Sequence, residues 1–329
     1  MSYQRIFLCF ATIAFLVTGV TNLSFPAAEY PNRPITLICP FPAGGSRDIL
    51  GRMLASVAEK YLGKPVIVLN KPGASGMIGG LAIVQAPPDG YNLGLCSTSD
   101  TSAIEWEIVN GRKPPFTRND FILIGSFTKS PVLVVVPFNS PWKTLSDLTK
   151  DLKAMPAHYA SCSGGLYNVT HISTEILLRA IGAKARLVPY TGGGPCLSAV
   201  VGGHVHFTTQ FLSSTIPLTR GNKLRILAVM GDTRIKSIPE VPTVKELGID
   251  AETYQMIGLS APRKTPAPIV ERWREVLRSV AEDKSFISMV ENQGDEVLFT
   301  DGDELAKYWD RDSERLAKLF KLLIGDEKK

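Results

Sequence analysis

Histidine and cysteine, the residues that most often build metal and catalytic centres, are scarce in this sequence. The 329 residues include four histidines and five cysteines, no Cys-x-x-Cys pair occurs, and the cysteine spacing fits no metal motif. His204 and His206 would share a face of an extended segment and could then bind a metal ion. No third ligand is evident near them, so exposed histidines at the end of a strand are the favoured interpretation and we expect no metal site.

Motifs for nucleophilic catalysis are missing as well. Residues 44–48 (GGSRD) lack the last glycine of the Gly-x-Ser-x-Gly motif of serine hydrolases. His171, which opens a predicted helix, could act as a base, but no nucleophile with a suitable partner can be named. We therefore expect a protein that is not an enzyme and needs no cofactor, with a hydrolase as the less favoured alternative.

Basic clusters are absent, and long apolar runs are absent after the N-terminus. The net charge of +5 is spread along the chain without a basic run interleaved with aromatic residues, which argues against nucleic-acid binding. Residues 6–20 are mostly apolar, Arg5 is the only charged residue before Glu29, and residues 26–28 (PAA) offer small residues for cleavage. That apolar run is shorter than the roughly 20 residues of a membrane span. We predict an export signal peptide over residues 1–28 and a periplasmic location; an uncleaved membrane anchor is the alternative.

Four cysteines would remain after removal of the signal peptide, and an exported protein can form disulfides. Cys39 and Cys96 fall at the ends of predicted strands, where a small buried apolar residue would also serve. We favour free, packed thiols for most of the four. A disulfide between Cys162 and Cys196 is the alternative.

Short strand-like runs alternate with amphipathic helical patterns, which predicts an α/β protein with largely parallel sheets. The expected strands are 35–39, 66–69, 93–96, 121–126, 132–136, 158–161, 186–188, 224–229, 254–260 and 296–299. The expected helices are 47–62, 75–85, 144–154, 170–181, 194–201, 213–220, 267–281 and 303–323. The last two helices are the clearest, because apolar residues recur at helical spacing, with Asp312 as one polar interruption in the second.

Proline and glycine residues interrupt the predicted strands and helices near residues 128–131 and 239–252. Two such boundaries predict one domain inserted into another. Residues 29–128 together with 252–329 would form one lobe, and residues 129–251 would form the other. Two chain crossings would then act as a hinge, and the cleft between the lobes is where a ligand would bind.

The stretch over residues 40–48 (PFPAGGSRD) is the most informative part of the chain. It follows the expected strand 35–39 and precedes a helix for which Ser46 is the expected N-cap and Gly63 the expected end. A strand, a glycine-rich turn and a helix start direct backbone N–H groups to one place, where an anion is favoured. An ordinary connection between a strand and a helix is the alternative that this stretch alone leaves open.

Six collinear segments between about residues 30 and 325 carry a family resemblance: 30–48, 66–74 (VIVLNKPGA), 86–93 (APPDGYNL), 188–195 (VPYTGGGP), 241–248 (VPTVKELG) and 261–270 (APRKTPAPIV). Together they resemble the solute receptors of tripartite tricarboxylate transporters, the Bug/TctC type. The resemblance implies an α/β, two-lobed periplasmic-binding-protein fold (Venus-flytrap, type II) with two chain crossings. It also implies a monomeric receptor that captures a small organic anion, mainly a carboxylate, and delivers it to membrane permease subunits. A ligand-sensing subunit for a membrane signalling partner is the alternative function.

The resemblance further implies that loops of both lobes bind the ligand through backbone N–H groups, hydroxyls and ordered waters. The implied ligand-binding residues are Phe41, Ala43, Gly44, Gly45, Ser46, Arg47, Asp48, Ser97, Thr98, Ser99, Ser161, Ser163, Gly164, Thr170, His171, Tyr190, Thr191, Gly192 and Gln210. Arg47 stands where the family commonly has a small hydroxyl residue, and it would either clamp a carboxylate or point to solvent. Gln210 stands where an aspartate is frequent. The loop 163–170, which contains Tyr167, is about two residues longer than usual.

Overall fold

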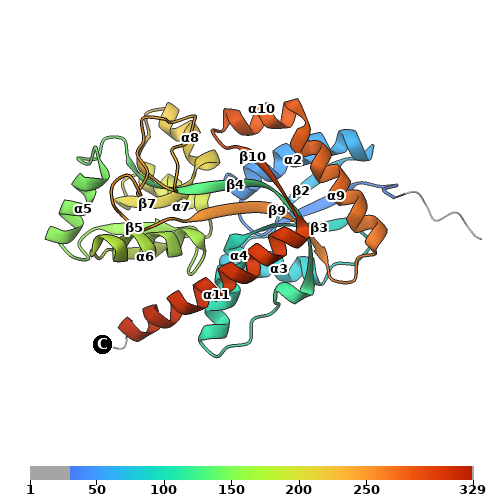
Figure 1. The fold of residues 1–329 in the computed structure, drawn as a ribbon, viewed down its shortest axis with the longest axis horizontal. Helices are drawn as coiled ribbons and strands as arrows, with labels where there is room; N and C mark the ends of the chain where they lie inside the picture. The colour runs from blue at the N-terminus through green and yellow to red at the C-terminus, as the bar shows by residue number, and fades with distance from the viewer. Residues whose placement is uncertain (1–29, 328–329) are drawn as a thin grey trace, which may run out of the picture. The chain divides into compact units, whose positions relative to one another are not determined.

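The computed structural model describes residues 30–327, and the predicted signal peptide lies outside that range. From Arg33 onward the chain forms one compact unit. Among the described residues, no helix combines the length and the apolar character that a membrane span needs. The compact unit contains two β-sheets that are joined by one long strand (Figure 1).

The first sheet consists of β1 (Ile35–Cys39), β2 (Val66–Asn70), β3 (Asn92–Ser97), β4 (Phe121–Pro137), β9 (Tyr254–Pro262) and β10 (Val297–Asp301). Its strand order is β2-β1-β3-β9-β4, and β10 pairs with β4. β1 is parallel to β2 and β3, whereas β9 is antiparallel to both β3 and β4. The second sheet consists of β5 (Ala160–Ser163), β6 (Arg186–Pro189), β7 (Phe207–Phe211), β8 (Leu224–Met230) and the end of β4. There β5 is parallel to β6 and β7, and β4 is antiparallel to β7 and β8.

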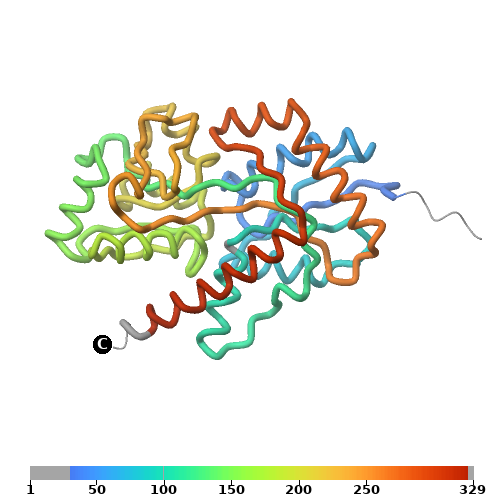
Figure 2. Tube along the Cα trace, viewed as in Figure 1, coloured from blue at the N-terminus to red at the C-terminus, as the bar shows by residue number. Residues whose placement is uncertain are grey.

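β4 passes from the first sheet into the second without interruption. Its residues up to Pro131 pair with β9, and its residues from Val132 onward pair with β7 and β8. Figure 2 shows β4 in green and β9 in orange as the two segments that run side by side between the sheets. The predicted lobe boundaries at 128/129 and 251/252 fall near these two segments and stay a prediction.

The expectation of largely parallel sheets is wrong. A parallel pair needs a crossover connection, usually a helix, between the two strands. β4 instead carries the chain out of the first sheet and β9 carries it back, so the two strands run against each other. The sheets are therefore mixed.

Helices cover both faces of the sheets (Figure 1). Their bounds are α2 (Ser46–Leu62), α3 (Met77–Val84), α4 (Thr98–Val109), α5 (Leu145–Ala154), α6 (Val169–Ile181), α7 (Gly193–Val201), α8 (Leu212–Arg220), α9 (Ala267–Glu282), α10 (Lys284–Asn292) and α11 (Gly302–Glu327), with short 3₁₀ turns η1 (Ala74–Gly76) and η2 (Arg118–Asp120). The sequence patterns miss β7, α4 and α10. We call β1, β2, β3, β9 and β10 with α2, α3, α4, α9, α10 and α11 lobe 1, and β5 to β8 with α5 to α8 lobe 2.

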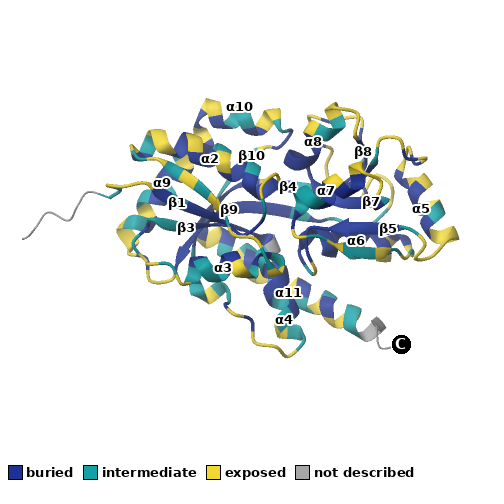
Figure 3. Ribbon diagram, turned by 180° about the vertical axis from the view of Figure 1, so that it is seen from behind, coloured by how far each residue is buried: buried dark blue, intermediate teal, exposed yellow. Residues whose placement is uncertain are grey.

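The buried residues follow the predicted helical spacing in the two C-terminal helices (Figure 3). Most strands are largely buried, whereas β2, β6 and β10 are partly exposed. In α9 the side chains of Val270, Trp273 and Leu277 are buried on one face. In α11 the polar interruption Asp312 is also buried, accepts hydrogen bonds from Arg315, and has its pKa raised by burial. The apolar face of α11 therefore includes a carboxylate that is paired within its own helix.

Cys162 of β5 and Cys196 of α7 form a disulfide, so the favoured expectation of free thiols is wrong for this pair. The two Cα atoms are 5.8 Å apart, which is within the usual range for a bridge. Cys39 and Cys96 are free and buried, as expected. Burial raises the pKa of Cys39 to about 11 and that of Cys96 to about 12, so both thiols stay protonated.

Candidate functional site

The loop between β1 and α2 is shaped by a buried carboxylate. Oδ2 of Asp48 accepts a hydrogen bond from the N–H of Gly44 at 3.1 Å, and Oδ1 accepts one from Nδ2 of Asn70 at 2.9 Å and one from Nε of Arg52 at 3.0 Å. The helix N-cap is Gly45, so the expectation that Ser46 caps α2 is wrong, and no side chain caps this end. The helix ends at Gly63 with φ of 64°, as expected. Asp48 is thus a residue that positions the loop.

The N-terminus of α7 in lobe 2 lies directly against this loop of lobe 1. Its N-cap is Gly192, again without a capping side chain. A Cβ atom placed on Gly192 would lie 2.5 Å from Cγ of Pro42, and one placed on Gly194 would lie 3.1 Å from the carbonyl oxygen of Ala43. The glycines therefore allow two uncapped helix N-termini, one from each lobe, to approach each other at backbone contact distance.

The loop between β5 and α6 also lies against the start of α7. A Cβ atom placed on Gly164 would lie 2.9 Å from the backbone nitrogen of Gly193. The N–H of Gly164 donates to Oγ1 of Thr170 at 2.9 Å, and that hydroxyl donates to Oδ1 of Asn168 at 2.8 Å. Asn168 also caps α6 by accepting from the N–H of His171 at 3.1 Å. In contrast to α2 and α7, α6 therefore has one N–H group of its first turn engaged by a capping side chain.

Two of the predicted site residues in lobe 2 each have a buried polar atom without a hydrogen-bond partner among the described residues. One is Oε1 of Gln210, which would lie 3.0 Å from a Cβ atom on Gly193, at the first turn of α7. The Nε2 atom of the same amide donates to Sγ of Cys196 at 3.4 Å. The other is Oγ of Ser161 in β5. Ser163, two residues later, donates its hydroxyl to the carbonyl of Gly165 at 2.9 Å.

Arg47 lies inside lobe 1, and the solvent-facing alternative is wrong, because only 3% of its surface is exposed. Nη1 is 2.8 Å from Oδ1 of Asp100 and donates to the carbonyl of Leu95 at 3.2 Å, and Nη2 donates to the hydroxyl of Ser97. The guanidinium carbon is 4.7 Å from the centre of the Phe41 ring. Of its nitrogens only Nε lacks a partner among the described residues. This pairing leaves little of the guanidinium for the carboxylate clamp that the sequence predicted.

Ser46 links α2 to two other elements. Its hydroxyl lies 2.8 Å from Oγ of Ser213 at the start of α8 and donates to Oε1 of Gln255 in β9 at 3.1 Å. Neither partner is a base, so these contacts do not favour a serine nucleophile. Ser97, Thr98 and Ser99 end β3 and begin α4, and Oγ1 of Thr98 donates to the carbonyl of Tyr254 at 3.4 Å. Ser213 and Gln255 were missed from the sequence, since no local pattern marks them.

Tyr190 and Thr191 directly precede the N-cap of α7, and His171 lies in the first turn of α6. Thr191 is exposed, and Tyr190 packs against the apolar cluster around Cys162 and Cys196. His171 lines a pocket of about 650 Å³ on the outer side of α6, together with Leu323 of α11. Its Nδ1 accepts from the N–H of Tyr167 at 2.8 Å, and burial lowers the pKa of His171 to about 4, so the ring is neutral.

A second pocket of about 680 Å³ opens beside the facing starts of α2 and α7. It is lined by Ala43, Gly44, Ile49, Gly194, Pro195, Leu197, Ser198, Val201, Ser214, Pro217 and Leu218. Backbone of the two glycine-rich turns forms one wall, and apolar side chains of α7 and α8 form much of the rest. The described residues contain no group of three or more His, Cys, Asp or Glu side chains arranged to hold a metal ion.

Comparison with known proteins identifies the family. A family model described as "Tripartite tricarboxylate transporter family receptor" matches residues 50–324. The chain belongs to this family of solute-binding receptors. The family resemblance of the sequence segments is thereby confirmed.

Relatives and solved structures agree with this assignment. A Cupriavidus necator protein described as "UPF0065 protein in gbd 5'region" is 32% identical over 288 residues, 85% of each chain. A solved structure described as a periplasmic transporter is 30% identical with a TM-score of 0.84, covering 89% of this chain and 97% of its own. An R. palustris protein solved with adipate is 25% identical with a TM-score of 0.83, covering 89% of this chain and 99% of its own. The α/β, two-lobed periplasmic-binding-protein fold is therefore confirmed.

Proposed function

We propose that this receptor captures a small organic anion, a carboxylate, between its lobes and delivers it to the permease subunits of a tripartite tricarboxylate transporter. The observation that carries the proposal is the pair of facing N-termini of α2 and α7, each with a glycine N-cap and no capping side chain. A helix N-terminus presents free N–H donors and a partial positive charge, and both favour an anion. A single carboxylate would accept hydrogen bonds from the starts of both helices. A ligand with a carboxylate at each end would bind one helix start with each of them.

The charged side chains of the β1–α2 loop are paired with other side chains, so we assign carboxylate binding to the backbone. Arg47 is paired with Asp100, and Asp48 is paired with Arg52 at 2.9 Å. Their charges are balanced within the protein, and Asp48 also accepts the N–H of Gly44, so the N–H groups in the first turns of α2 and α7 are the donors we assign to the carboxylate. The relative that was solved with adipate supports a dicarboxylate as the first compound to test.

The comparisons support the proposed transporter partner and the proposed location. The family description names a transporter receptor, and a solved structure of this fold is described as a periplasmic transporter. We propose that residues 1–28 direct export to the periplasm and that the mature receptor works as a monomer, presenting one closed ligand complex at a time to the permease.

The test is a thermal-shift screen of the purified mature protein against mono-, di- and tricarboxylates, followed by calorimetric titration of adipate and the strongest binder. A ligand that binds only the folded protein raises its melting temperature. We expect at least one carboxylate to do so, and uncharged amides of the same compounds to have no effect. A panel in which no carboxylate shifts the melting temperature would contradict the proposed ligand class.

Two glycine variants test the location of the site. In Gly192→Ala the new Cβ atom would lie 2.5 Å from the rigid ring of Pro42 and would push the two helix starts apart, so carboxylate affinity should fall about tenfold or more, which is about 1.4 kcal/mol. Gly221→Ala at the end of α8 is the matched control, because its Cβ atom would meet nothing closer than 3.4 Å. Wild-type affinity in a folded Gly192→Ala variant would place the ligand elsewhere.

A further inference from the structure

Tyr167 of lobe 2 inserts its ring between two helices of lobe 1. It belongs to the loop between β5 and α6 and has a φ of 57°, in the left-handed region that large residues rarely adopt. Its ring is stacked on that of Trp106 in α4, with centroids 3.4 Å apart and an angle of 13° between the planes. Its edge contact is Phe320 of α11, with centroids 6.1 Å apart. An unfavourable backbone conformation is thus combined with an aromatic contact between the lobes.

The surrounding contacts form an interface between lobe 1 and lobe 2 at this position. Trp106, Phe320 and Leu316 of lobe 1 form a buried apolar cluster with Ile172 of α6, and Tyr167 packs against this cluster. Beside it, the hydroxyl of Ser75 in η1 donates to the carbonyl of Leu166 at 2.8 Å. Residues 166–172 of lobe 2 therefore contact three separate elements of lobe 1.

The same loop carries groups of the proposed ligand site. Gly164, which lies against the start of α7, precedes Tyr167 by three residues, and its N–H is held by Thr170. The N–H of Tyr167 donates to Nδ1 of His171 in the first turn of α6. Because Gly164 and Tyr167 are both anchored to the first turn of α6, a displacement of α6 away from lobe 1 would move the Tyr167 ring and Gly164 together.

We propose that Tyr167 is a positioning residue, an aromatic latch that holds lobe 2 against lobe 1 and thereby sets how slowly the ligand leaves. This inference rests on the proposed function. A ligand that contacts both lobes binds only the arrangement in which they are together, so its apparent affinity depends on the population of that arrangement. An aromatic pair stabilises an interface by more than the burial of its area accounts for. This additional free energy corresponds to about a two- to tenfold change in ligand affinity, and the change falls mainly on the dissociation rate.

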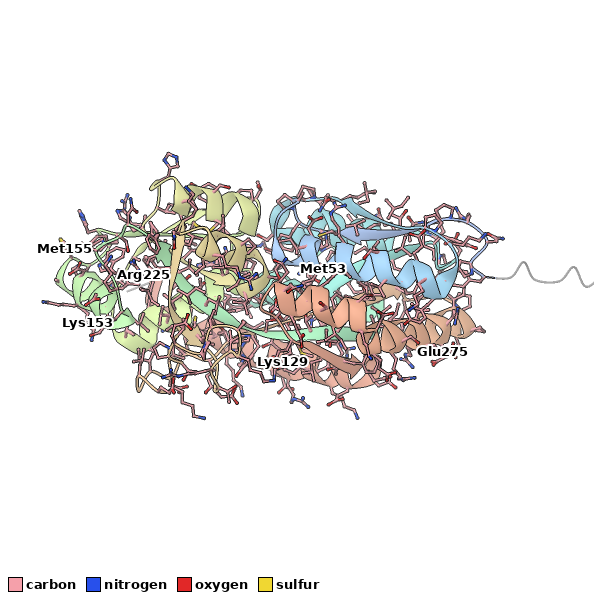
Figure 4. All side chains as sticks on the ribbon, turned by 90° about the horizontal axis from the view of Figure 1, so that it is seen from above. Met53, Lys129, Lys153, Met155, Arg225 and Glu275 are labelled. Carbon is pink, nitrogen blue, oxygen red and sulfur yellow. A yellow bond between two sulfur atoms is a disulfide. The ribbon has the colours of Figure 1, made fainter. Side chains whose placement is uncertain are left out.

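The deciding measurement is the distance between the lobes in protein without ligand. Lys153 of α5 and Glu275 of α9 are exposed and lie at opposite ends of the molecule (Figure 4), so both can be replaced by cysteine and spin-labelled. The described native cysteines are either buried or bridged and should not react. In Tyr167→Ala the distance distribution should shift away from that of the wild type, whereas Tyr167→Phe, which keeps the stacked ring, should restore it. Leu166→Ala is the matched control, because this neighbouring side chain is largely exposed.

The second measurement is the dissociation rate of adipate by stopped flow. We expect it to rise about tenfold in Tyr167→Ala, with a nearly unchanged association rate, and to return to the wild-type value in Tyr167→Phe. A wild-type distance distribution in a folded Tyr167→Ala variant would overturn the latch. If adipate does not bind even to the wild type, the proposed ligand is wrong, while the distances without ligand still decide about the latch.

Discussion

Replacing Arg47 by alanine separates a structural role of its guanidinium from a role in ligand binding. The pair with Asp100 is buried, since 3% of the Arg47 side chain and 14% of the Asp100 side chain are exposed. Arg47→Ala would leave the Asp100 carboxylate without its counter-charge, although the N–H of Ser97 would still donate to it at 2.9 Å. Breaking a buried pair in this way costs about 3–5 kcal/mol of unfolding free energy.

This free energy can be expressed as a melting temperature. An unfolding entropy of about 2.1 cal/mol/K per residue gives about 0.6 kcal/mol/K for a protein of roughly 300 residues. The melting temperature of Arg47→Ala should therefore be lower by about 5–8 °C. Carboxylate affinity of the folded variant should stay within about threefold of the wild type, because the proposed donors are backbone N–H groups.

Two control variants sharpen this test. Arg33→Ala removes an ion pair with Asp89 in which 57% and 42% of the side chains are exposed, and it should cost at most about 1 kcal/mol. The double variant Arg47→Met/Asp100→Leu removes both buried charges and should recover most of the lost stability, since apolar replacement of a buried pair is often close to neutral. The assays are urea unfolding, calorimetry and titration with adipate. An Arg47→Ala variant that melts like the wild type but binds adipate at least about tenfold more weakly would refute this reasoning and support the clamp predicted from the sequence.

Two further predictions concern stability. The double variant Cys162→Ser/Cys196→Ser should lose about 4 kcal/mol of unfolding free energy under oxidising conditions, since the bridge joins residues 34 positions apart; an unchanged urea midpoint would contradict this. Asp295 is buried beside the hydroxyl of Ser130, and burial raises its pKa to about 6. Between about pH 4 and pH 6 the folded protein therefore binds more protons at this site than the unfolded chain, so this carboxyl should lower the unfolding free energy by about 3 kcal/mol as the pH rises. Asp295→Asn should flatten that part of the stability profile, and a profile with the same decline would show that another group causes it.

The sequence predicted those strands and helices in which the spacing of polar and apolar residues within the segment itself indicates the structure. β7 was missed because its three central residues, Thr208 to Gln210, are polar, and yet the whole strand is buried. Thr208 donates to the carbonyl of Cys162 on one neighbour, and Thr209 donates to the carbonyl of Thr170 in α6. A strand buried on both faces loses the alternation of polar and apolar residues on which sequence-based prediction depends.

The prediction of the candidate site rests on local patterns as well. Glycine-rich turns after strands indicate loops at the carboxyl ends of a sheet, where ligands bind in α/β proteins. The expectation for Ser46 failed because it was based on a local cap. Its hydroxyl instead reaches Ser213 and Gln255, which are 167 and 209 positions away in the sequence. The fold brings these partners together, Ser213 at the start of α8 and Gln255 in the returning strand β9.

Thr170 and His171 show why neighbouring residues can serve different parts of the site. Successive residues of a helix point about 100° apart, so one of them can face the glycine-rich turns while the next faces outward. Thr170 holds the N–H of Gly164, whereas His171 lies in the pocket that Leu323 of α11 helps to form. Because the imidazole is buried there, it is neutral and accepts the N–H of Tyr167. The histidine that the family resemblance assigned to the ligand therefore supports the loop of Tyr167, the residue that we propose as the aromatic latch.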